Sequence, residues 1–320
     1  MKVFIPNSAF IGNIDPFLKS LDLSNDGKLE ITAHKQWVSV HPVVLSMIAS
    51  LGIGLNPENI FCERLEMKSK GYLERMGLFK MLGIESGIQI TEHESAGRFI
   101  PLTRITNTFE LDDFLKEMIT LLHLKPEHTE AIKYIVSELV RNVLEHARAG
   151  TGAIVSAQYY KKSNRFSIGI VDRGIGIKSS INQSYSVDTN IKAIQLALTP
   201  GITGTTSIEG GTEFNAGAGL FFIKSIATVN RDLFMLYSGD ALYKLLRIPE
   251  EVRISLHTDP FKDRHSVKEN LPFWQGTVVG VDIDLDDTEK FSKLLDYIRN
   301  AYLGAIRERK RVRIKRPKFL

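Results

Sequence analysis

The chain has 320 residues, 43% of them hydrophobic and 24% charged, and a formal net charge of +4. This balance is typical of globular proteins and excludes collagen-like, low-complexity and intrinsically disordered classes. The single cysteine, Cys62, excludes an intrachain disulfide framework and a multi-cysteine metal site. Because the sequence also has no apolar leader and no uncharged apolar run of about 18 residues, we expect a cytoplasmic protein without a membrane span.

The first hundred residues are expected to alternate between strands and helices. Strand-like runs lie at residues 2–6, 29–40 and 59–67, and helical patterns at 16–21, 43–51 and 71–82. Such alternation predicts a small α/β layer structure. The polar stretch 91–98 predicts a boundary. We therefore expect one domain over residues 1–100, a second over 106–286, and a C-terminal helix and basic tail over 287–320.

The remaining chain is helix-rich at first and mixed later. Helices are expected at 111–122, 127–147, 190–198, 220–229 and 291–306, and strands at 153–160, 165–172, 233–238, 252–257 and 277–285. A glycine-rich loop is expected at 201–217. The tail 307–318 holds eight Lys or Arg and one acid, so it carries a formal +7 and the rest of the chain −3. The basic excess therefore belongs to the tail and does not indicate a nucleic-acid-binding body.

The helix expected at 127–147 carries a first group of polar residues. Apolar residues at helical spacing form one stripe, and Glu138, Asn142 and Glu145 share another face. A carboxylate and a carboxamide one turn apart offer a base for water and a neutral oxygen for a hard cation. Alone, the pattern fits a solvated helix face equally well.

A second group follows the strand expected at 165–172. Asp172 ends that strand, and Gly174 and Gly176 allow the backbone to approach a flat ligand closely. The carboxylate can then accept a hydrogen bond from an amino group on the edge of that ligand. As a lone Asp-x-Gly-x-Gly pattern, the segment favours a simple turn.

The third group is a run of glycines directly before the helix expected at 220–229. Gly217 and Gly219 leave backbone N–H groups exposed at the positive end of the helix dipole, which suits phosphates. The segment lacks the Gly-Lys-Ser/Thr of a P-loop and the preceding strand of a Rossmann fingerprint. Alone, it fits a flexible glycine loop equally well.

Together, the order and spacing of these segments resemble the GHKL superfamily, which contains DNA gyrase, heat-shock chaperones, histidine kinases and the MutL repair proteins. The matching residues are Glu138 and Asn142 (N box), Asp172, Gly174 and Gly176 (first glycine box), Gly217, Gly219 and Leu220 (second glycine box), and Thr277 (late strand beside adenine). The resemblance covers about residues 110–286. It implies an α/β fold of the Bergerat type, a two-layer sandwich with a mixed β-sheet.

The resemblance also implies ATP and Mg²⁺ as ligands. Asn142 would coordinate the metal, and Glu138 would orient or deprotonate the attacking water. Asp172 would bind the adenine amino group, with Thr277 supporting the base. The two glycine boxes would make room for the base and hold the phosphates, and residues 199–216 would form a lid. His146 lies where related sequences often place a polar or basic side chain near the phosphates, and a packing role fits it equally well.

The layout of the first hundred residues is similar to STAS domains, whose partners include GHKL-type serine kinases. Ser39 is the nearest candidate for the serine that accepts phosphate in such domains. The Asp-Ser-Ser-Gly signature is absent, which favours a docking or regulatory role.

Three functions stay open: an ATP-hydrolysing enzyme, an anti-sigma-type serine kinase with a STAS-like substrate, and an ATP-responsive binding module without turnover. No histidine followed by Glu and a Leu-Arg-x-Pro pattern precedes the N box, and His128 reads as a surface residue. A conventional autophosphorylating histidine kinase is therefore not expected. We favour an ATP-binding regulatory protein with Mg²⁺-dependent hydrolysis that acts on a protein partner or as a dimer. Nucleic acid is an alternative partner of the tail and is not favoured.

Overall fold

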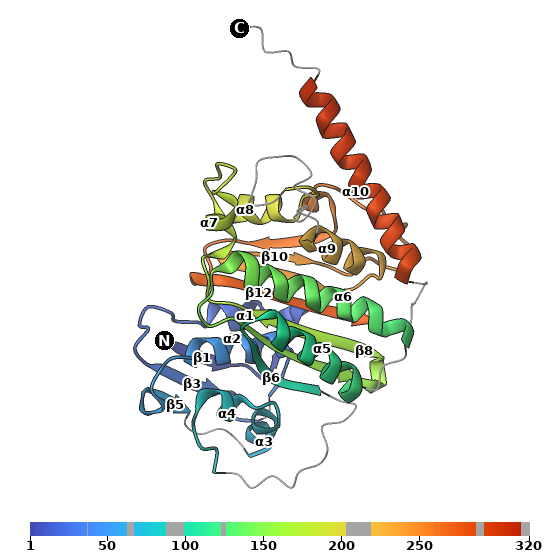
Figure 1. The fold of residues 1–320 in the computed structure, drawn as a ribbon. Helices are drawn as coiled ribbons and strands as arrows, with labels where there is room; N and C mark the ends of the chain where they lie inside the picture. The colour runs from blue at the N-terminus through green and yellow to red at the C-terminus, as the bar shows by residue number, and fades with distance from the viewer. Residues whose placement is uncertain are drawn as a thin grey trace.

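The computed structural model describes residues 1–36, 38–62, 67–87, 99–122, 126–202, 219–285 and 291–314. The described residues form three layers (Figure 1). A seven-stranded sheet lies in the middle, helices from the C-terminal two-thirds cover one of its faces, and the N-terminal region covers the other.

The central sheet is antiparallel. Its strands are β6 (Phe99–Ile105), β7 (Ala153–Tyr160), β8 (Arg165–Val171), β9 (Phe234–Gly239), β10 (Ala241–Leu245), β11 (His265–Lys268) and β12 (Trp274–Asp284), in the spatial order β11-β10-β9-β12-β8-β7-β6. Every described pair in it runs antiparallel, so the expectation of a mixed sheet is wrong. Short connections such as β7–β8 and β9–β10 join neighbouring strands as hairpins, which forces opposite directions.

Both faces of this sheet are buried. Val155 and Ile170 point into the core shared with the helices, whereas Ile154 and Val171 point into the core shared with the N-terminal region. The alternation follows from the two-residue period of a strand. It explains why these strands read as almost continuous apolar runs.

The helical layer lies on the first of these cores. It contains α5 (Thr108–Leu122), α6 (Pro126–Asn142), α7 (Gly176–Ile181), α8 (Asn190–Ala197), α9 (Gly219–Val229) and α10 (Phe291–Ile314). The apolar stripe expected on α6 is buried as predicted, and α6 ends in a π-helical turn, Val143–Ala147. α10 continues to Ile314, so the first part of the basic tail is helical. None of the described helices combines the length and apolar character that a membrane crossing requires.

The N-terminal region alternates strands and helices, as expected. β1 (Lys2–Ile5), β3 (Leu29–Ala33) and β5 (Ile60–Cys62) form a parallel sheet in the order β1-β3-β5, and β2 (Ser8–Ala9) pairs with β4 (Ser39–Val40). The helices are α1 (Asp15–Lys19), α2 (Pro42–Gly52), α3 (Met67–Arg75) and α4 (Leu78–Leu82). Short 3-10 turns occupy Ile11–Asn13, Pro57–Asn59, Lys161–Ser163 and Pro260–Lys262.

Helix α2 joins the N-terminal region to the central sheet. All eleven of its residues are buried, and it packs on β7 and β8. A Cβ on Gly169 of β8 would lie 2.2 Å from Val43 Cα, so only glycine admits the helix at this distance. At the N-terminal end of α2, His41 Nε2 lies 3.3 Å from an Asp282 carboxylate oxygen. The N-terminal region and the sheet therefore share one core.

Several expected elements differ from the structure. The strand expected at 29–40 is split into β3 and β4 by a turn at 34–36, where the Gln36 N–H donates to His34 Nδ1. The helix expected at 71–82 is split into α3 and α4 at Gly77, whose φ is 75°. Of the strand expected at 59–67, the structure describes β5 at Ile60–Cys62 and the start of α3 at Met67, and residues 63–66 lie outside the described residues.

The strand expected at 252–257 is wrong, because residues 253–257 have no regular secondary structure. The guanidinium of Arg231 donates to the carbonyls of Ile248, Pro249, Glu250 and Val252, so the start of this segment bonds to a side chain. Strands β6, β10 and β11 and helix α7 were not expected from the sequence.

Candidate nucleotide-binding site

The N-terminal end of α9 meets the C-terminal end of α6. Glu138 and Asn142 lie one turn apart on α6, and both are half-buried. A Cβ on Gly219, the first residue of α9, would lie 2.7 Å from Glu138 Oε2 and 3.4 Å from Asn142 Nδ2. The absence of a side chain at Gly219 thus lets the start of α9 lie directly against both polar groups. The structure brings these three predicted residues together.

Burial raises the pKa of Glu138 above its ordinary value, Arg141 opposes the shift, and the nearby carboxylate of Glu145 adds to it. A carboxylate that is more basic than usual accepts a proton more readily. Its position beside Gly219 places this carboxylate at the N-terminal end of α9, the end of a helix whose dipole attracts anions.

The π-helical turn after Asn142 fixes the loop that follows β8. The Ile175 N–H donates to the Ala147 carbonyl over 2.8 Å. A Cβ on Gly174 would lie 2.0 Å from that same carbonyl oxygen. The first of the two predicted glycines is therefore required by packing against the end of α6, and it joins this loop to the helix that carries Glu138.

Asp172 is buried at the end of β8, with 2% of its surface exposed. The Gly174 N–H donates to its Oδ1 over 2.7 Å, and Thr277 hydrogen-bonds its carboxyl group. Burial nevertheless raises the pKa of Asp172 to about 6. A buried carboxylate with such a pKa favours a ligand that donates a hydrogen bond to it.

Gly176 has a φ of 76° and opens α7. A Cβ there would lie 3.1 Å from Ser238 Oγ and 3.3 Å from the Gly276 carbonyl oxygen. The Ile177 N–H donates to Ser238 Oγ over 3.0 Å, and the Ser238 hydroxyl donates to the Gly276 carbonyl over 2.6 Å. Ser238 is a residue of this site that the sequence does not reveal, because its partners lie far away in the chain.

Residues 104–230 match the family model of the histidine kinase-like ATPase domain. This chain contains a histidine kinase-like ATPase domain. The match includes the residues that resemble the N box and both glycine boxes, whereas Thr277 lies beyond it. No curated protein is significantly similar to the chain.

Two predicted parts of the ATPase domain fall wholly or mostly outside the described residues. They are Gly217 and the lid expected at 199–216, of which the structure describes 199–202. Leu220, from the second glycine box, is half-buried and packs against the core beneath the helices. Thr277 is half-buried on β12, where its carbonyl accepts the Asp172 N–H over 2.9 Å.

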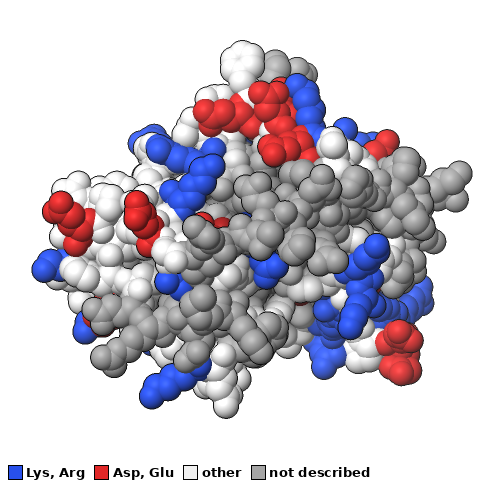
Figure 2. All heavy atoms as spheres, turned by 90° about the horizontal axis from the view of Figure 1, so that it is seen from below, with Lys and Arg blue, Asp and Glu red and all other residues white. Residues whose placement is uncertain are grey.

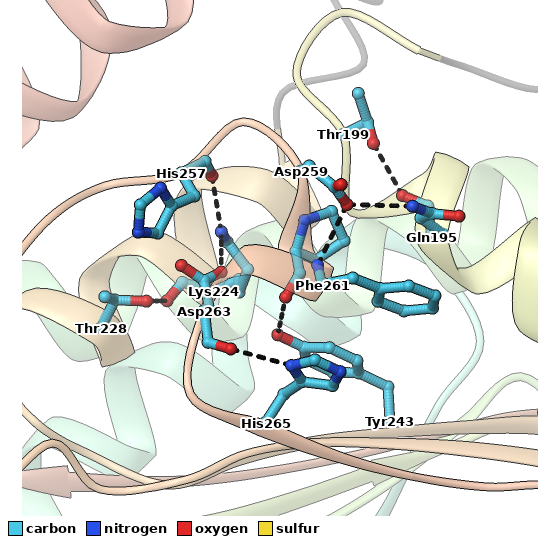
Figure 3. Close-up of polar contacts among 11 residues, drawn as sticks. Gln195, Thr199, Lys224, Thr228, Tyr243, His257, Asp259, Phe261, Asp263 and His265 are labelled. Atoms are coloured by element: carbon cyan, nitrogen blue, oxygen red, sulfur yellow. Dashed lines mark hydrogen bonds and ion pairs between the residues drawn. The ribbon is translucent and has the colours of Figure 1, made fainter.

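A buried ion pair holds α9 from its other side (Figure 3). Lys224 Nζ lies 2.5 Å from Asp263 Oδ2 and donates to the His257 carbonyl over 3.0 Å. Both side chains are buried. Burial lowers the pKa of Lys224 and raises that of Asp263, and each partner's charge opposes the other's shift. The pair anchors the helix whose first residue contacts Glu138.

The same segment also contacts the end of α8. Gln195 donates to Asp259 over 2.9 Å, and the Thr199 hydroxyl donates to the Gln195 carbonyl over 2.7 Å (Figure 3). Gln195 precedes residues 203–218, and Lys224 of α9 follows them. Both side chains therefore bond to residues 257–263. No sequence pattern predicts this arrangement.

The described residues contain no cluster of three or more His, Cys, Asp and Glu side chains able to hold a metal. The donors present, the carboxamide of Asn142 and the carboxylate of Glu138, suit Mg²⁺ bound mainly by water and phosphate oxygens, which needs only one or two protein ligands. The residues present therefore fit a nucleotide-bound Mg²⁺ and do not form a metal cage.

The structure also describes two further residues singled out in the sequence, His146 and Ser39. His146 is in the π-helical turn, with Nε2 3.9 Å from a Glu145 carboxylate oxygen. Ser39 is half-buried in β4, where its N–H donates to the Asn7 carbonyl over 2.9 Å. On the face seen from below, basic and acidic side chains lie in several separate small groups (Figure 2). No single basic patch dominates the described side chains in that view.

Proposed function

We propose that the ATPase domain binds ATP with Mg²⁺ and hydrolyses it, and that the protein acts as an ATP-dependent regulator. The observation that carries the proposal is the contact of Glu138 and Asn142 with the backbone of Gly219 at the start of α9. This contact supports the proposal because a base, a hard oxygen ligand and a helix N-terminus would together serve a nucleoside triphosphate.

Asp172 would select the base. Its buried carboxylate lies at the end of β8 and can accept a hydrogen bond from the exocyclic amino group of adenine. Guanine carries a carbonyl oxygen at the corresponding position and would face the carboxylate with like partial charge. The site therefore favours ATP over GTP.

Asn142 and the N–H groups at the start of α9 would hold the phosphates and their metal. The bound Mg²⁺ would neutralise phosphate charge. Glu138, whose pKa is raised by burial, would orient the attacking water and take up its proton.

A hydroxyl group of a protein serine needs the same help as water. Phosphotransfer to a partner or to the N-terminal region, for which the STAS-like layout remains a proposal, is therefore the second candidate. The raised pKa of Glu138 favours either reaction over an ATP-responsive module without turnover.

The test follows the γ-phosphate of labelled ATP. Hydrolysis releases the label as free phosphate, whereas a kinase transfers it to protein. Glu138→Ala should bind Mg²⁺-ATP almost as tightly as the wild type but lose turnover by a factor of about 10²–10⁴. Asn142→Ala should weaken Mg²⁺-dependent binding itself.

The surface variant Glu117→Ala is the matched control, because Glu117 is an exposed carboxylate on α5. It should leave binding and turnover unchanged. Equal loss of nucleotide affinity in Glu138→Ala and Asn142→Ala would contradict the separate roles. Failure of the wild type to bind ATP would remove the proposal as a whole.

A further inference from the structure

Four consecutive residues at the start of β12 hold the loop that carries Asp172. They are Trp274, Gln275, Gly276 and Thr277, and the pairing of β12 with β9 shifts register between Trp274 and Thr277. An irregularity of this kind turns side chains of one strand toward a neighbouring loop. Here that loop is Asp172 to Gly174.

The contact at Gly276 is made by the backbone itself. Gly276 has a φ of 110°, and a Cβ there would lie 2.2 Å from the Asp172 carbonyl oxygen and 2.8 Å from Arg173 Cα. Only glycine can take this conformation at this distance. The two backbones are therefore in direct contact, and side chains on either side of Gly276 can reach the loop.

Trp274 contacts the loop through its buried indole. Its indole is fully buried, and Nε1 donates to the Asp172 carbonyl over 3.2 Å. The guanidinium of Arg173 lies over the same ring, with Cζ 5.1 Å from the ring centroid. The ring of Tyr237 packs against it on the side of the N-terminal core. Trp274 thus fixes the peptide next to the predicted base-binding carboxylate.

Gln275 holds the other end of the loop. Gln275 is exposed, yet its Nε2 donates to the Gly174 carbonyl over 2.5 Å. The Gly174 N–H in turn donates to Asp172 Oδ1. Trp274 and Gln275 therefore donate to the Asp172 and Gly174 carbonyls, one at each end of this turn. The Gly174 N–H orients the Asp172 carboxylate.

We propose that Trp274 and Gln275 are positioning residues for base selection at the ATP site. They hold the Asp172–Gly174 turn so that the carboxylate keeps the direction in which it accepts the adenine amino group. The inference rests on the proposed function. It adds that selectivity for adenine depends on two side chains that need not touch the nucleotide.

The test separates base recognition from phosphate binding. ATP, GTP and inorganic tripolyphosphate, each with Mg²⁺, are titrated calorimetrically into the full-length protein. Gln275→Met keeps the length of the side chain and removes the donor, and Trp274→Phe keeps a buried ring and removes the indole N–H. Each variant should reduce the preference for ATP over GTP by about threefold to tenfold, the effect of one hydrogen bond. Tripolyphosphate affinity should not change.

Gln36→Met is the matched control, because Gln36 is exposed and its bond to His34 uses the backbone N–H. It should leave all three affinities unchanged. Unchanged ATP selectivity in Gln275→Met would overturn the positioning role, as would an equal loss for ATP and tripolyphosphate. Because Gln275 is exposed, that variant decides the matter even if Trp274→Phe does not fold. A wild type that binds tripolyphosphate but shows no preference for ATP would instead overturn the proposed base recognition, and the positioning role with it.

Discussion

Asp172 is a buried carboxyl group whose ionisation controls what it can bind. Its pKa is raised to about 6 by burial, against an ordinary value of 3.8. Above this pH the ionised group accepts hydrogen bonds only, and below it the group carries a proton of its own. Recognition of an amino group should therefore weaken as the pH falls through about 6.

We expect the ATP affinity of the wild type to fall below pH 6 more steeply than that of Asp172→Asn. At pH 8 the variant should bind ATP about tenfold or more weakly, because a charge-assisted hydrogen bond is lost. Calorimetric titration of both proteins from pH 5 to 8 measures this, and protonation of ATP itself cancels in the comparison. Asp188→Asn, at an exposed position, is the control.

The same pKa has a consequence for the protein without nucleotide. The folded state binds the Asp172 proton more tightly than the unfolded state, so between the two pKa values stability rises as the pH is lowered. Asp172→Asn removes the cost of burying the charge at pH 8. The variant should therefore be more stable than the wild type there, by on the order of 2 kcal/mol. Lower stability of the variant at pH 8 would contradict the raised pKa.

At the scale of elements, α9 is held at its start and near its middle. Gly219 contacts Glu138 and Asn142 at its start, and Lys224 forms the buried ion pair with Asp263 one turn further on. A charge left alone in such a place is costly, because its partner no longer compensates for the loss of water. The ion pair therefore matters for the position of the helix as well as for stability.

Lys224→Met should lower the free energy of unfolding by about 3–5 kcal/mol, since it leaves Asp263 buried without its partner. The double variant Lys224→Met/Asp263→Leu should recover most of this loss. Lys116→Met breaks an ion pair of which both side chains are more than three-quarters exposed and should change stability by less than about 1 kcal/mol. Denaturant titration compares all three. A double variant as unstable as the single one would contradict this interpretation.

The sequence predicted those elements whose signal is local. The stripe of α6 follows the helical period, β8 is a buried apolar run, and both are found where expected. β11 was missed because His265–Lys268 is short and polar, and β10 because it is only five residues long and Lys244 interrupts its apolar residues. In the segment expected as a strand at 252–257, the first carbonyl, that of Val252, accepts from the Arg231 guanidinium, and no local pattern shows this contact.

The residues of the candidate site also divide into those with a local sequence signal and those without one. Glu138, Asn142, Asp172 and the glycines could be found because each motif is contiguous in sequence. Trp274, Gln275 and Ser238 could not, because each acts through a partner about sixty or a hundred residues away. From the sequence alone, Trp274 would be taken for an ordinary core residue. The structure shows that its indole N–H donates to the Asp172 carbonyl.

At the scale of the whole molecule, the N-terminal region and the ATPase domain meet through a buried polar set as well as through apolar packing. Ser46 and Ser156 are joined across the interface over 2.9 Å. His41 and Ser167 both bond Asp282. Burial opposes the ionisation of Asp282, but the bonds from His41 and Ser167 hold its pKa below the ordinary value. Such an interface is specific and makes independent opening of the two parts costly.

We therefore expect nucleotide binding to protect both parts together. With a non-hydrolysable ATP analogue, hydrogen exchange should slow in α2 and β3 as well as in β8 and β12, because a ligand stabilises the whole cooperative unit. Gly169→Ala, which forces a Cβ against Val43, should lower stability by about 1–3 kcal/mol or more and weaken this coupling. Protection confined to residues 104–230 would show that the N-terminal region opens independently and serves as a dock for a separate partner.

Every residue of α2 is buried in the folded protein, so the order in which the chain is synthesised affects its folding. Synthesis begins at the N-terminus, so Pro42–Gly52 leaves the ribosome long before β8 and β12, the strands that share its core. Until Trp274–Asp284 has been translated, the apolar helix α2 cannot be buried by all of the elements that surround it in the folded protein. Folding must then wait for contacts between distant parts of the chain, which is slow and exposes the intermediate to aggregation. A nascent chain stalled before β12 should therefore be a client of the chaperones that bind apolar segments at the ribosome exit.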